Sequence, residues 1–232
     1  CEENHFIMIG GLEYGPSIAN DTDHVTPLRN EAFIAIPQIL NKNENENGEN
    51  GVRQHCTIFR IPKILPAEEE ESILKKYNYS FQKGNKLYVF ESSLLGNWAI
   101  LICSDFMNLP IHVLLQAQIQ TLFVLAYNRD VNGYASIADT IHRLLMCNVV
   151  ICNMGNYGSS LAFAPFRKDY KRQKLRIVGN DIDVAVTIVL PLNDIIRAQR
   201  GEFLIDNENN EQLFIKCPPD FGKFQIFKGR NG

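Results

Sequence analysis

The chain has 232 residues, 45% of them hydrophobic, so it can bury a substantial core within one domain, expected over residues 1–232. The net charge of −3 excludes an overall basic surface of the kind that recruits nucleic acid. No apolar run reaches the roughly 18 residues of a membrane-spanning helix, so we expect no membrane segment.

The first third of the sequence predicts a hairpin-rich region. His5–Gly11, Glu31–Pro37 and Cys56–Ile61 are short apolar runs bounded by glycine, proline or polar residues, which is typical of strands. Residues 41–54 begin with a stretch rich in Asn, Glu and Gly that cannot pack, and we expect a mobile insertion there.

The rest of the chain alternates strands and helices. Helices are predicted at Pro66–Lys76, Ile111–Gln120, Tyr134–Met146 and Pro191–Arg200. Strands are predicted at 87–91, 98–103, 121–126, 148–153, 159–164, 175–178 and 182–190. Alternation in the middle with hairpins at the ends indicates a layered α/β fold with a mixed sheet.

Six cysteines lie at positions 1, 56, 103, 147, 152 and 217. They form no CxxC pair and no Cys/His set with zinc spacing, so we expect neither a metal site nor a disulfide framework. Free cysteines beside apolar runs are typical of a reduced protein, which favours a cytoplasmic location.

Cys103 ends the fully apolar run 98–103 and precedes a predicted strand-to-helix turn. The carboxyl end of a buried strand is where α/β folds place their sites, and donors at a helix start can stabilise a thiolate or an oxyanion. From position alone, a buried small residue is the alternative interpretation.

Lys63 follows a strand and lies between Pro62 and Pro66, in a segment with little freedom. A lysine held in this way can stabilise a thiolate or a developing oxyanion. An ordinary lysine at a strand end is the alternative.

Together these residues belong to a longer pattern. The segment 81–110, FQKGNKLYVFESSLLGNWAILICSDFMNLP, resembles the core of the carbon–nitrogen hydrolase (nitrilase) family, where an apolar strand ends in Cys-x-Asp and a proline follows. Lys63, 40 residues before Cys103, resembles the family's catalytic lysine. IMIGG with LRNEAFIAIP, NVVICN with GNYGSSLAFAP, and VAVTIVLPLNDIIRAQR are similar to its flanking strands and last helix.

The resemblance implies a four-layer αββα sandwich that dimerises and hydrolyses a non-peptide C–N bond in an amide, nitrile or carbamoyl compound. Cys103 would form a thioester or thioimidate, and Lys63 would stabilise the tetrahedral intermediate. The family needs no metal or organic cofactor. Tyr127 and Asn128 correspond to its substrate-facing segment, with an ordinary loop turn as the alternative for Asn128.

The family's general-base glutamate precedes the GG strand, at which this chain begins. Glu13 is one candidate for the base, and a residue upstream of Cys1 is the other, in which case the first strand and helix of the sandwich are missing too. A second family glutamate corresponds to one of Glu68 to Glu71, although that run is also an ordinary acidic helix start.

Three function classes therefore compete. The first is a hydrolase, and the second is a catalytically incomplete module used for oligomerisation or regulation within a larger fused protein. The third is a Cys–His hydrolase, for which nothing in the sequence orients His112 toward Cys103.

Overall fold

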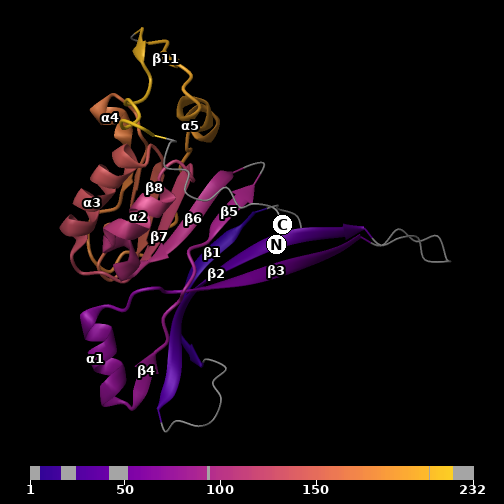
Figure 1. Ribbon diagram of the computed structural model, residues 1–232, viewed down its shortest axis with the longest axis vertical. Helices are drawn as coiled ribbons and strands as arrows, with labels where there is room; N and C mark the ends of the chain where they lie inside the picture. Colours follow the sequence, from indigo (N-terminus) through magenta and orange to yellow (C-terminus); the bar gives the residue numbers. More distant parts are fainter. Residues whose placement is uncertain (1–5, 17–24, 42–51, 93–94, 209, 222–232) are drawn as a thin grey trace, which may run out of the picture. The chain divides into compact units, whose positions relative to one another are not determined.

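The computed structural model describes residues 6–16, 25–41, 52–92, 95–208 and 210–221 (Figure 1). The chain divides into two compact units, Cys1–Asn85 and Lys86–Gly232. A sheet organises each unit, and the two are described in turn. The expectation of one domain over residues 1–232 stays a prediction.

The first unit contains an antiparallel meander of three strands with one short parallel strand beside it. Its elements are β1 (Met8–Pro16), β2 (Thr26–Asn41), β3 (Val52–Pro62), α1 (Glu68–Lys76) and β4 (Tyr79–Phe81), which pairs with β2. Ala32, Ile34 and Ile61 are buried, and Ala32 and Ile34 lie on one face of β2 because side chains two residues apart share a face.

The β2–β3 hairpin confirms the two strands predicted at 31–37 and 56–61, and both are longer than predicted. Asn41 pairs with Val52, so the expected insertion at 41–54 starts and ends inside the hairpin ladder. Residues 42–51 lie outside the described part of the chain.

The helix predicted at 66–76 is α1. Four glutamates occupy its first turn and two lysines its last, an order that complements the helix dipole. Leu74 and Glu70 are its buried residues, and their spacing of four puts them on one face of the helix.

The second unit contains a six-stranded mixed sheet in the order β10-β9-β8-β7-β6-β5. The neighbours β6, β7 and β8 are parallel, and the flanking pairs are antiparallel, so the sheet is mixed, as the sequence predicted. The strands are β5 (Val89–Ser92), β6 (Gly96–Ile102), β7 (Thr121–Ala126), β8 (Asn148–Asn153), β9 (Leu161–Phe163) and β10 (Gln173–Arg176).

Helices and one small hairpin complete this unit. They are the 3₁₀ helix η1 (Cys103–Met107), α2 (Leu109–Leu115), α3 (Val131–Leu144), α4 (Asp169–Arg172), α5 (Leu192–Gln199), and the strands β11 (Ile205–Asp206) and β12 (Glu211–Gln212). α3 packs along β8 and β9 (Figure 1). Asn108 and Asp130 cap α2 and α3 by accepting from the N–H groups of Ile111 and Gly133.

One predicted helix ends too late, and one predicted strand is wrong. The helix predicted at 111–120 ends at Leu115, because Gln116 has extended backbone angles and Ala117 has a φ of 57°. The segment 182–190, predicted as a strand, carries no ladder in the described structure. Its apolar residues alternate as in a strand, but Val184, Val186 and Val189 remain exposed, since no sheet edge pairs with the segment.

Within the described ranges, no helix is both long and apolar enough to cross a membrane.

Gly84 fixes the segment that follows β3. Its N–H donates to the carbonyl of Lys63 at 2.8 Å, and a Cβ at this position would lie 2.7 Å from the carbonyl oxygen of Pro62. We expect Gly84→Ala to destabilise the fold by about 1–3 kcal/mol, because rigid backbone has to move. Urea unfolding measures this.

Gly11→Ala is the matched control, because a Cβ at Gly11 meets nothing within 4 Å. Equal midpoints for the Gly84→Ala and Gly11→Ala proteins would show that the tight approach at Gly84 is unimportant.

Candidate active site

Lys63 is fixed through its backbone on both sides. It directly follows β3, its N–H donates to the carbonyl of Asn30 at 2.8 Å, and its own carbonyl accepts from Gly84 at 2.8 Å. The side chain is only 2% exposed. The interpretation of Lys63 as an ordinary surface lysine is therefore wrong.

The ammonium of Lys63 is paired with Glu70 on α1, with 2.5 Å between Nζ and Oε2. Glu70 also accepts from the Tyr14 hydroxyl at 2.6 Å, Asn30 Nδ2 at 2.9 Å and the Ala67 N–H at 2.9 Å. Burial would raise the pKa of Glu70, but these four hydrogen bonds together hold it below its ordinary value. The pair is thus an ionised carboxylate against a buried ammonium.

The structure distinguishes the four consecutive glutamates from one another. Glu68 and Glu69 are exposed and Glu71 is half-buried, whereas Glu70 is 9% exposed. The resemblance left these four residues equivalent, and only Glu70 shares the buried face of α1 with Leu74.

Cys103 lies where the central parallel strands end. Residues Ala99 to Ile102 of β6 are buried, and the chain then turns into η1 with a φ of 47° at Cys103. A positive φ is uncommon for a residue with a side chain and marks local strain. Ala117 and Ser159 also have positive φ, so strain alone does not identify a site. At Cys103 it accompanies a partly exposed thiol.

Two groups contact the sulfur of Cys103. The carbonyl of Tyr127 lies 3.9 Å from Sγ, and the hydroxyl of Tyr134 on α3 lies 3.7 Å from it. Tyr127 directly follows β7, which pairs in parallel with β6, so both residues lie at the carboxyl ends of adjacent strands.

Asn153, the last residue of β8, holds the loop after β7. Its Oδ1 accepts from the Asn128 N–H at 3.0 Å, and its Nδ2 donates to the carbonyls of Asn128 at 2.9 Å and Gly158 at 2.8 Å. Asn128 Oδ1 accepts in turn from the Asp130 N–H at 2.7 Å, which is the loop turn that the sequence left open.

An aromatic pair, the exposed Tyr127 and the half-buried Tyr157, lies on the loops after β7 and β8. The rings of Tyr127 and Tyr157 are 5.1 Å apart, and their hydroxyls are 3.2 Å apart. Arg129 donates from Nε to the Tyr157 hydroxyl at 3.1 Å and lies over its ring. The side chains of Tyr127, Tyr157 and Arg129 form a polar aromatic rim. The backbone carbonyl of Tyr127, one of these residues, contacts the sulfur of Cys103.

The structure therefore brings Cys103, Tyr127 and Asn128 together in the second unit, and it places Lys63 in the first unit with Glu70. Tyr134 and Asn153 were not identified from the sequence. Tyr134 is a single aromatic residue within an amphipathic helix, and no local pattern marks it.

The described buried histidines do not face the thiol. His142 stacks on Phe163 and bonds through Nδ1 to the carbonyl of Ala138 at 3.0 Å, and burial lowers its pKa to about 4. His112 bonds through Nε2 to the carbonyl of Phe106 at 2.7 Å, and burial lowers its pKa too. Both are core residues, so a Cys–His arrangement finds no support among them.

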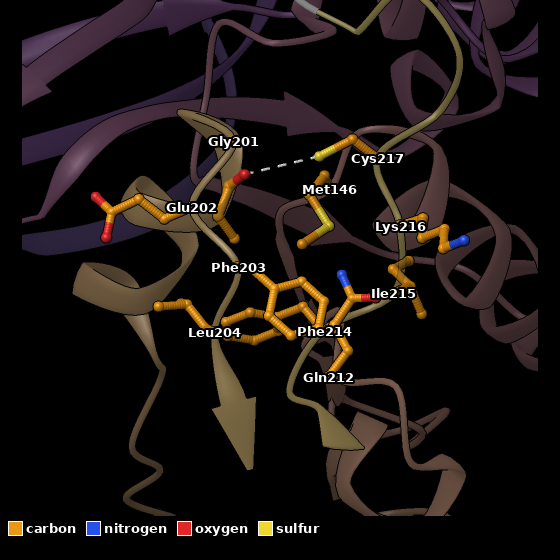
Figure 2. Close-up of a pocket in the computed structure, with 11 residues that line it drawn as sticks. Met146, Gly201, Glu202, Phe203, Leu204, Gln212, Phe214, Ile215, Lys216 and Cys217 are labelled. Carbon is orange, nitrogen blue, oxygen red and sulfur yellow. Dashed lines mark hydrogen bonds between the residues drawn. The ribbon is translucent and has the colours of Figure 1, made fainter. Parts of the chain in front are cut away.

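Two cavities lie elsewhere in the second unit. One, near α5, has a volume of about 190 Å³ (Figure 2). It is lined by Met146, Ala198, Gly201, Glu202, Phe203, Leu204, Gln212, Phe214, Ile215, Lys216 and Cys217. The other, of about 400 Å³, is lined by Asp139, Arg143, Phe163, Asp169, Arg172 and Gln173. Neither includes a residue that contacts Cys103.

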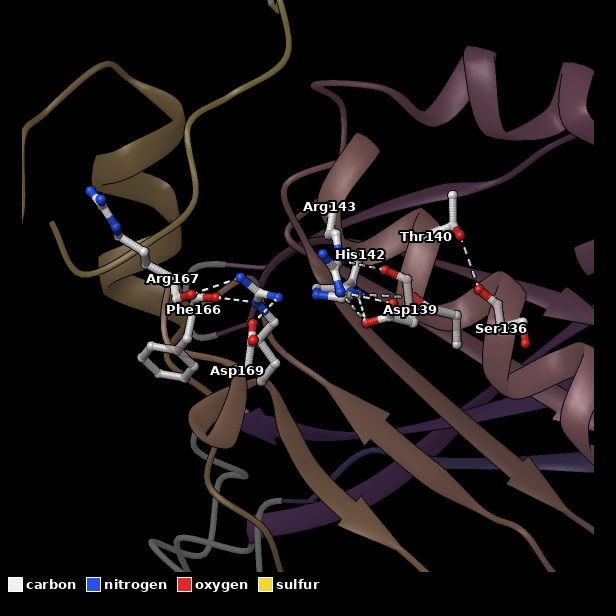
Figure 3. Close-up of polar contacts among 10 residues, drawn as sticks. Ser136, Asp139, Thr140, His142, Arg143, Phe166, Arg167 and Asp169 are labelled. Atoms are coloured by element: carbon white, nitrogen blue, oxygen red, sulfur yellow. Dashed lines mark hydrogen bonds and ion pairs between the residues drawn. The ribbon is translucent and has the colours of Figure 1, made fainter.

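The charges around the second cavity are paired. Arg143 binds Asp139, with 2.8 Å between Nη2 and Oδ1 (Figure 3). Arg172 binds Asp169 and the carbonyls of Phe166 and Arg167. Among the described residues, no three His, Cys, Asp or Glu side chains cluster in a way that could hold a metal.

Comparison with known proteins identifies the fold. No protein-family model and no curated protein matches the chain. Solved structures of a nitrilase-superfamily amidase from Nesterenkonia sp. AN1 do. A cysteine-to-alanine mutant matches with a TM-score of 0.50, at 14% identity over 86% of this chain and 67% of that one.

Two further forms of this amidase also match. The cysteine mutant in complex with butyramide gives a TM-score of 0.52 at 14% identity, over 85% of this chain and 66% of that one. A glutamate-to-leucine mutant carries the acetamide moiety of fluoroacetamide on the active-site cysteine and gives 0.53 at 15% identity, with the same coverage. This chain thus spans about two thirds of the amidase.

These likenesses confirm the expected fold class. The chain has a mixed α/β fold that matches nitrilase-like αββα sandwiches.

The Lys63–Glu70 pair makes stability depend on pH. The folded pKa of Glu70 is depressed, so the pair contributes fully above the unfolded value of 4.5, and this contribution is lost as pH falls through the folded pKa. Glu70→Gln should lower the free energy of unfolding by about 3–5 kcal/mol at pH 7, because it leaves Lys63 buried and unpaired. Urea titrations at pH 7 and at successively lower pH measure both effects.

Glu69→Gln is the control, since Glu69 is exposed on the same helix. A Glu70→Gln protein as stable as the Glu69→Gln protein at pH 7 would contradict a compensating role for Glu70.

Proposed function

We propose that the protein is a hydrolase of non-peptide carbon–nitrogen bonds, with Cys103 as nucleophile and Lys63 as its electrostatic partner. Its substrates are small amides, nitriles or carbamoyl compounds. The proposal combines a fold shared with nitrilase-superfamily amidases and the local chemistry of two residues.

One observation carries the proposal. Cys103 ends a buried parallel strand in a left-handed conformation with its thiol partly exposed. A buried structural cysteine, such as Cys147, needs neither that conformation nor access to solvent. A strained strand-to-helix turn that presents a nucleophile is a recurrent solution in α/β hydrolases.

The reaction has two halves. The thiolate of Cys103 attacks the carbonyl carbon of an amide, the carbonyl oxygen becomes negative, and the amine leaves with a proton to give a thioester. Water then attacks the thioester carbon, and the thiol and the carboxylic acid are released. A nitrile would pass through the corresponding thioimidate.

Lys63 has the charge that this scheme needs. The proposal requires its ammonium to lie against the oxygen that becomes negative in the tetrahedral intermediate. Glu70 fits a positioning role, because Lys63, Tyr14, Asn30 and the Ala67 N–H already occupy its carboxylate. A carboxylate held by four donors and kept ionised is a poor general base.

The proposed reaction also needs a general base and residues that contact the substrate. Glu13 lies on β1 at the break in register between Leu12 and Gly15, and the structure does not describe its side chain. Tyr127 and Asn128 remain the proposed substrate contacts, since they adjoin Cys103. The amidase of the same fold binds butyramide, so aliphatic amides are the first substrates to test.

A cellular location and an assembly state are also part of the proposal. The cysteine pattern supports a cytoplasmic location, and the family resemblance supports a homo-oligomer, with fusion to another domain upstream of Cys1 as a further arrangement. Light scattering on the intact protein tests the oligomer.

Selective alkylation tests the nucleophile. With iodoacetamide at neutral pH, Cys103 should be labelled ahead of Cys56 and Cys147, as followed by peptide mass spectrometry. Cys56 is exposed and is the matched comparison, whereas burial raises the pKa of Cys147 and keeps it unreactive. Labelling of Cys56 as fast as Cys103 would count against an activated nucleophile.

Hydrolysis of butyramide by the intact protein tests the activity. Cys103→Ala should lower kcat/KM about a thousandfold or more. The double variant Lys63→Met with Glu70→Gln should lower kcat about 100-fold or more while keeping the fold, because it removes both buried charges together.

Full activity in the Cys103→Ala protein would overturn the hydrolase proposal. Rapid labelling of Cys103 without hydrolysis of any amide or nitrile would favour the catalytically incomplete module instead.

A further inference from the structure

Tyr134 is a buried residue whose hydroxyl faces the thiol. It lies in the first turns of α3, is 4% exposed, and its ring packs 5.6 Å from that of Phe106 on η1. Its hydroxyl donates to Cys103 Sγ over 3.7 Å. A buried phenol normally needs a partner for its hydroxyl, and here that partner is the proposed nucleophile.

Asn128 also acts on the Tyr134 hydroxyl. Its Oδ1 accepts from the Asp130 N–H at 2.7 Å, so its Nδ2 is the end left to donate. A hydrogen bond from the Asn128 side chain lowers the pKa of the Tyr134 phenol, as a donor does. The Tyr134 hydroxyl itself donates to Sγ.

We infer that Tyr134 is a further catalytic residue, whose hydroxyl donates to the sulfur of Cys103 and stabilises the thiolate that attacks the substrate. This inference rests on the proposed role of Cys103 as nucleophile. The relay runs from the Asp130 N–H through the Asn128 amide and the Tyr134 hydroxyl to Sγ, and it is built within one unit.

The two contacts of Sγ respond differently to ionisation. A thiol donates its proton to the Tyr127 carbonyl and accepts from Tyr134. When the thiol proton passes to a base, the thiolate has nothing to donate, and the carbonyl oxygen repels it. The Tyr134 hydroxyl then remains as a donor, and a charged acceptor strengthens its hydrogen bond.

Tyr134 also keeps its own proton. Burial raises its pKa, and so do Cys103 and Asp105, the titratable groups on η1 that act on it. A tyrosine that stays neutral at every working pH is suited to donating a hydrogen bond and not to accepting the thiol proton. The thiol proton therefore goes to a carboxylate or to solvent.

The test is the pH dependence of Cys103 alkylation by iodoacetamide in the intact protein. Tyr134→Phe keeps the ring and removes only the hydroxyl. We expect the rate at pH 7 to fall about fivefold, the order of one hydrogen bond to a charged group, and the profile to move to higher pH with the same plateau. Tyr170→Phe, at a residue that is 71% exposed, is the control and should leave the profile in place.

A second variant turns the Tyr134 hydroxyl away from Sγ without removing the hydroxyl. Asn128→Asp preserves the oxygen that accepts from Asp130 but replaces the donor with a second acceptor, so the Tyr134 proton turns toward the introduced carboxylate in place of Sγ. We expect the same shift of the alkylation profile as in Tyr134→Phe. Thermal unfolding of each variant identifies any loss of the folded state.

The outcomes separate this inference from the proposed function. An unchanged profile in both folded variants would overturn the role of Tyr134, and butyramide hydrolysis would still report on Cys103. A lower plateau at an unchanged pH would indicate a packing role only and would overturn it as well. A shifted profile without hydrolysis of any amide or nitrile would support the hydrogen bond from Tyr134 to Sγ, but it would overturn the proposed function and with it a catalytic role for Tyr134.

Discussion

The buried ammonium of Lys63 constrains the first unit more than any other group. A charged amine removed from water costs several kcal/mol unless a counter-charge and hydrogen bonds compensate it. Glu70 on α1 supplies the charge, and Tyr14 on β1 and Asn30 on β2 satisfy the remaining carboxylate positions. Asn30 serves twice, because its carbonyl also accepts from the Lys63 N–H. The places of two strands and one helix are therefore tied to one buried charge.

In the second unit, polar loops are fixed at the ends of parallel strands. Asn153 uses both ends of its amide to join the loop after β7 to Gly158, and within that loop Asn128 Oδ1 accepts from the Asp130 N–H. These groups are partly buried, and hydrogen-bonded amides of this kind hold a loop in one conformation. A nucleophile on such a frame needs little reorganisation before it reacts.

The fold and the chemistry contribute different amounts to the functional argument. At 14–15% identity, the likeness to the Nesterenkonia amidase establishes the architecture. One fold hosts many activities, so the reaction has to be argued from the residues. The strained backbone at Cys103 and the pairing of the buried Lys63 ammonium with Glu70 provide two such arguments. Each rests on contacts within its own unit.

Elements with a strong local signal were predicted well. The runs 121–126 and 148–153 are apolar, short and bounded by polar residues, and the strands β7 and β8 have these same ends. The segment 182–190 has a pattern just as regular and yet forms no ladder in the described structure. A strand needs a neighbouring edge as well as alternation, and the sequence of one segment does not contain its neighbour.

The sequence by itself determined the α/β class, the strand that presents Cys103 and the rigid segment that carries Lys63. Apolar periodicity and proline spacing are local properties, so they can be recognised in the sequence of a single segment. Only the tertiary structure decided that Glu70 is the partner among four glutamates, and that the Tyr127 carbonyl and the Tyr134 hydroxyl converge on the sulfur. Tyr14 and Glu70 are 56 residues apart, and Cys103 and Tyr134 are 31 apart. Contacts over such separations depend on strand register and helix packing, because only these bring distant side chains within hydrogen-bond distance.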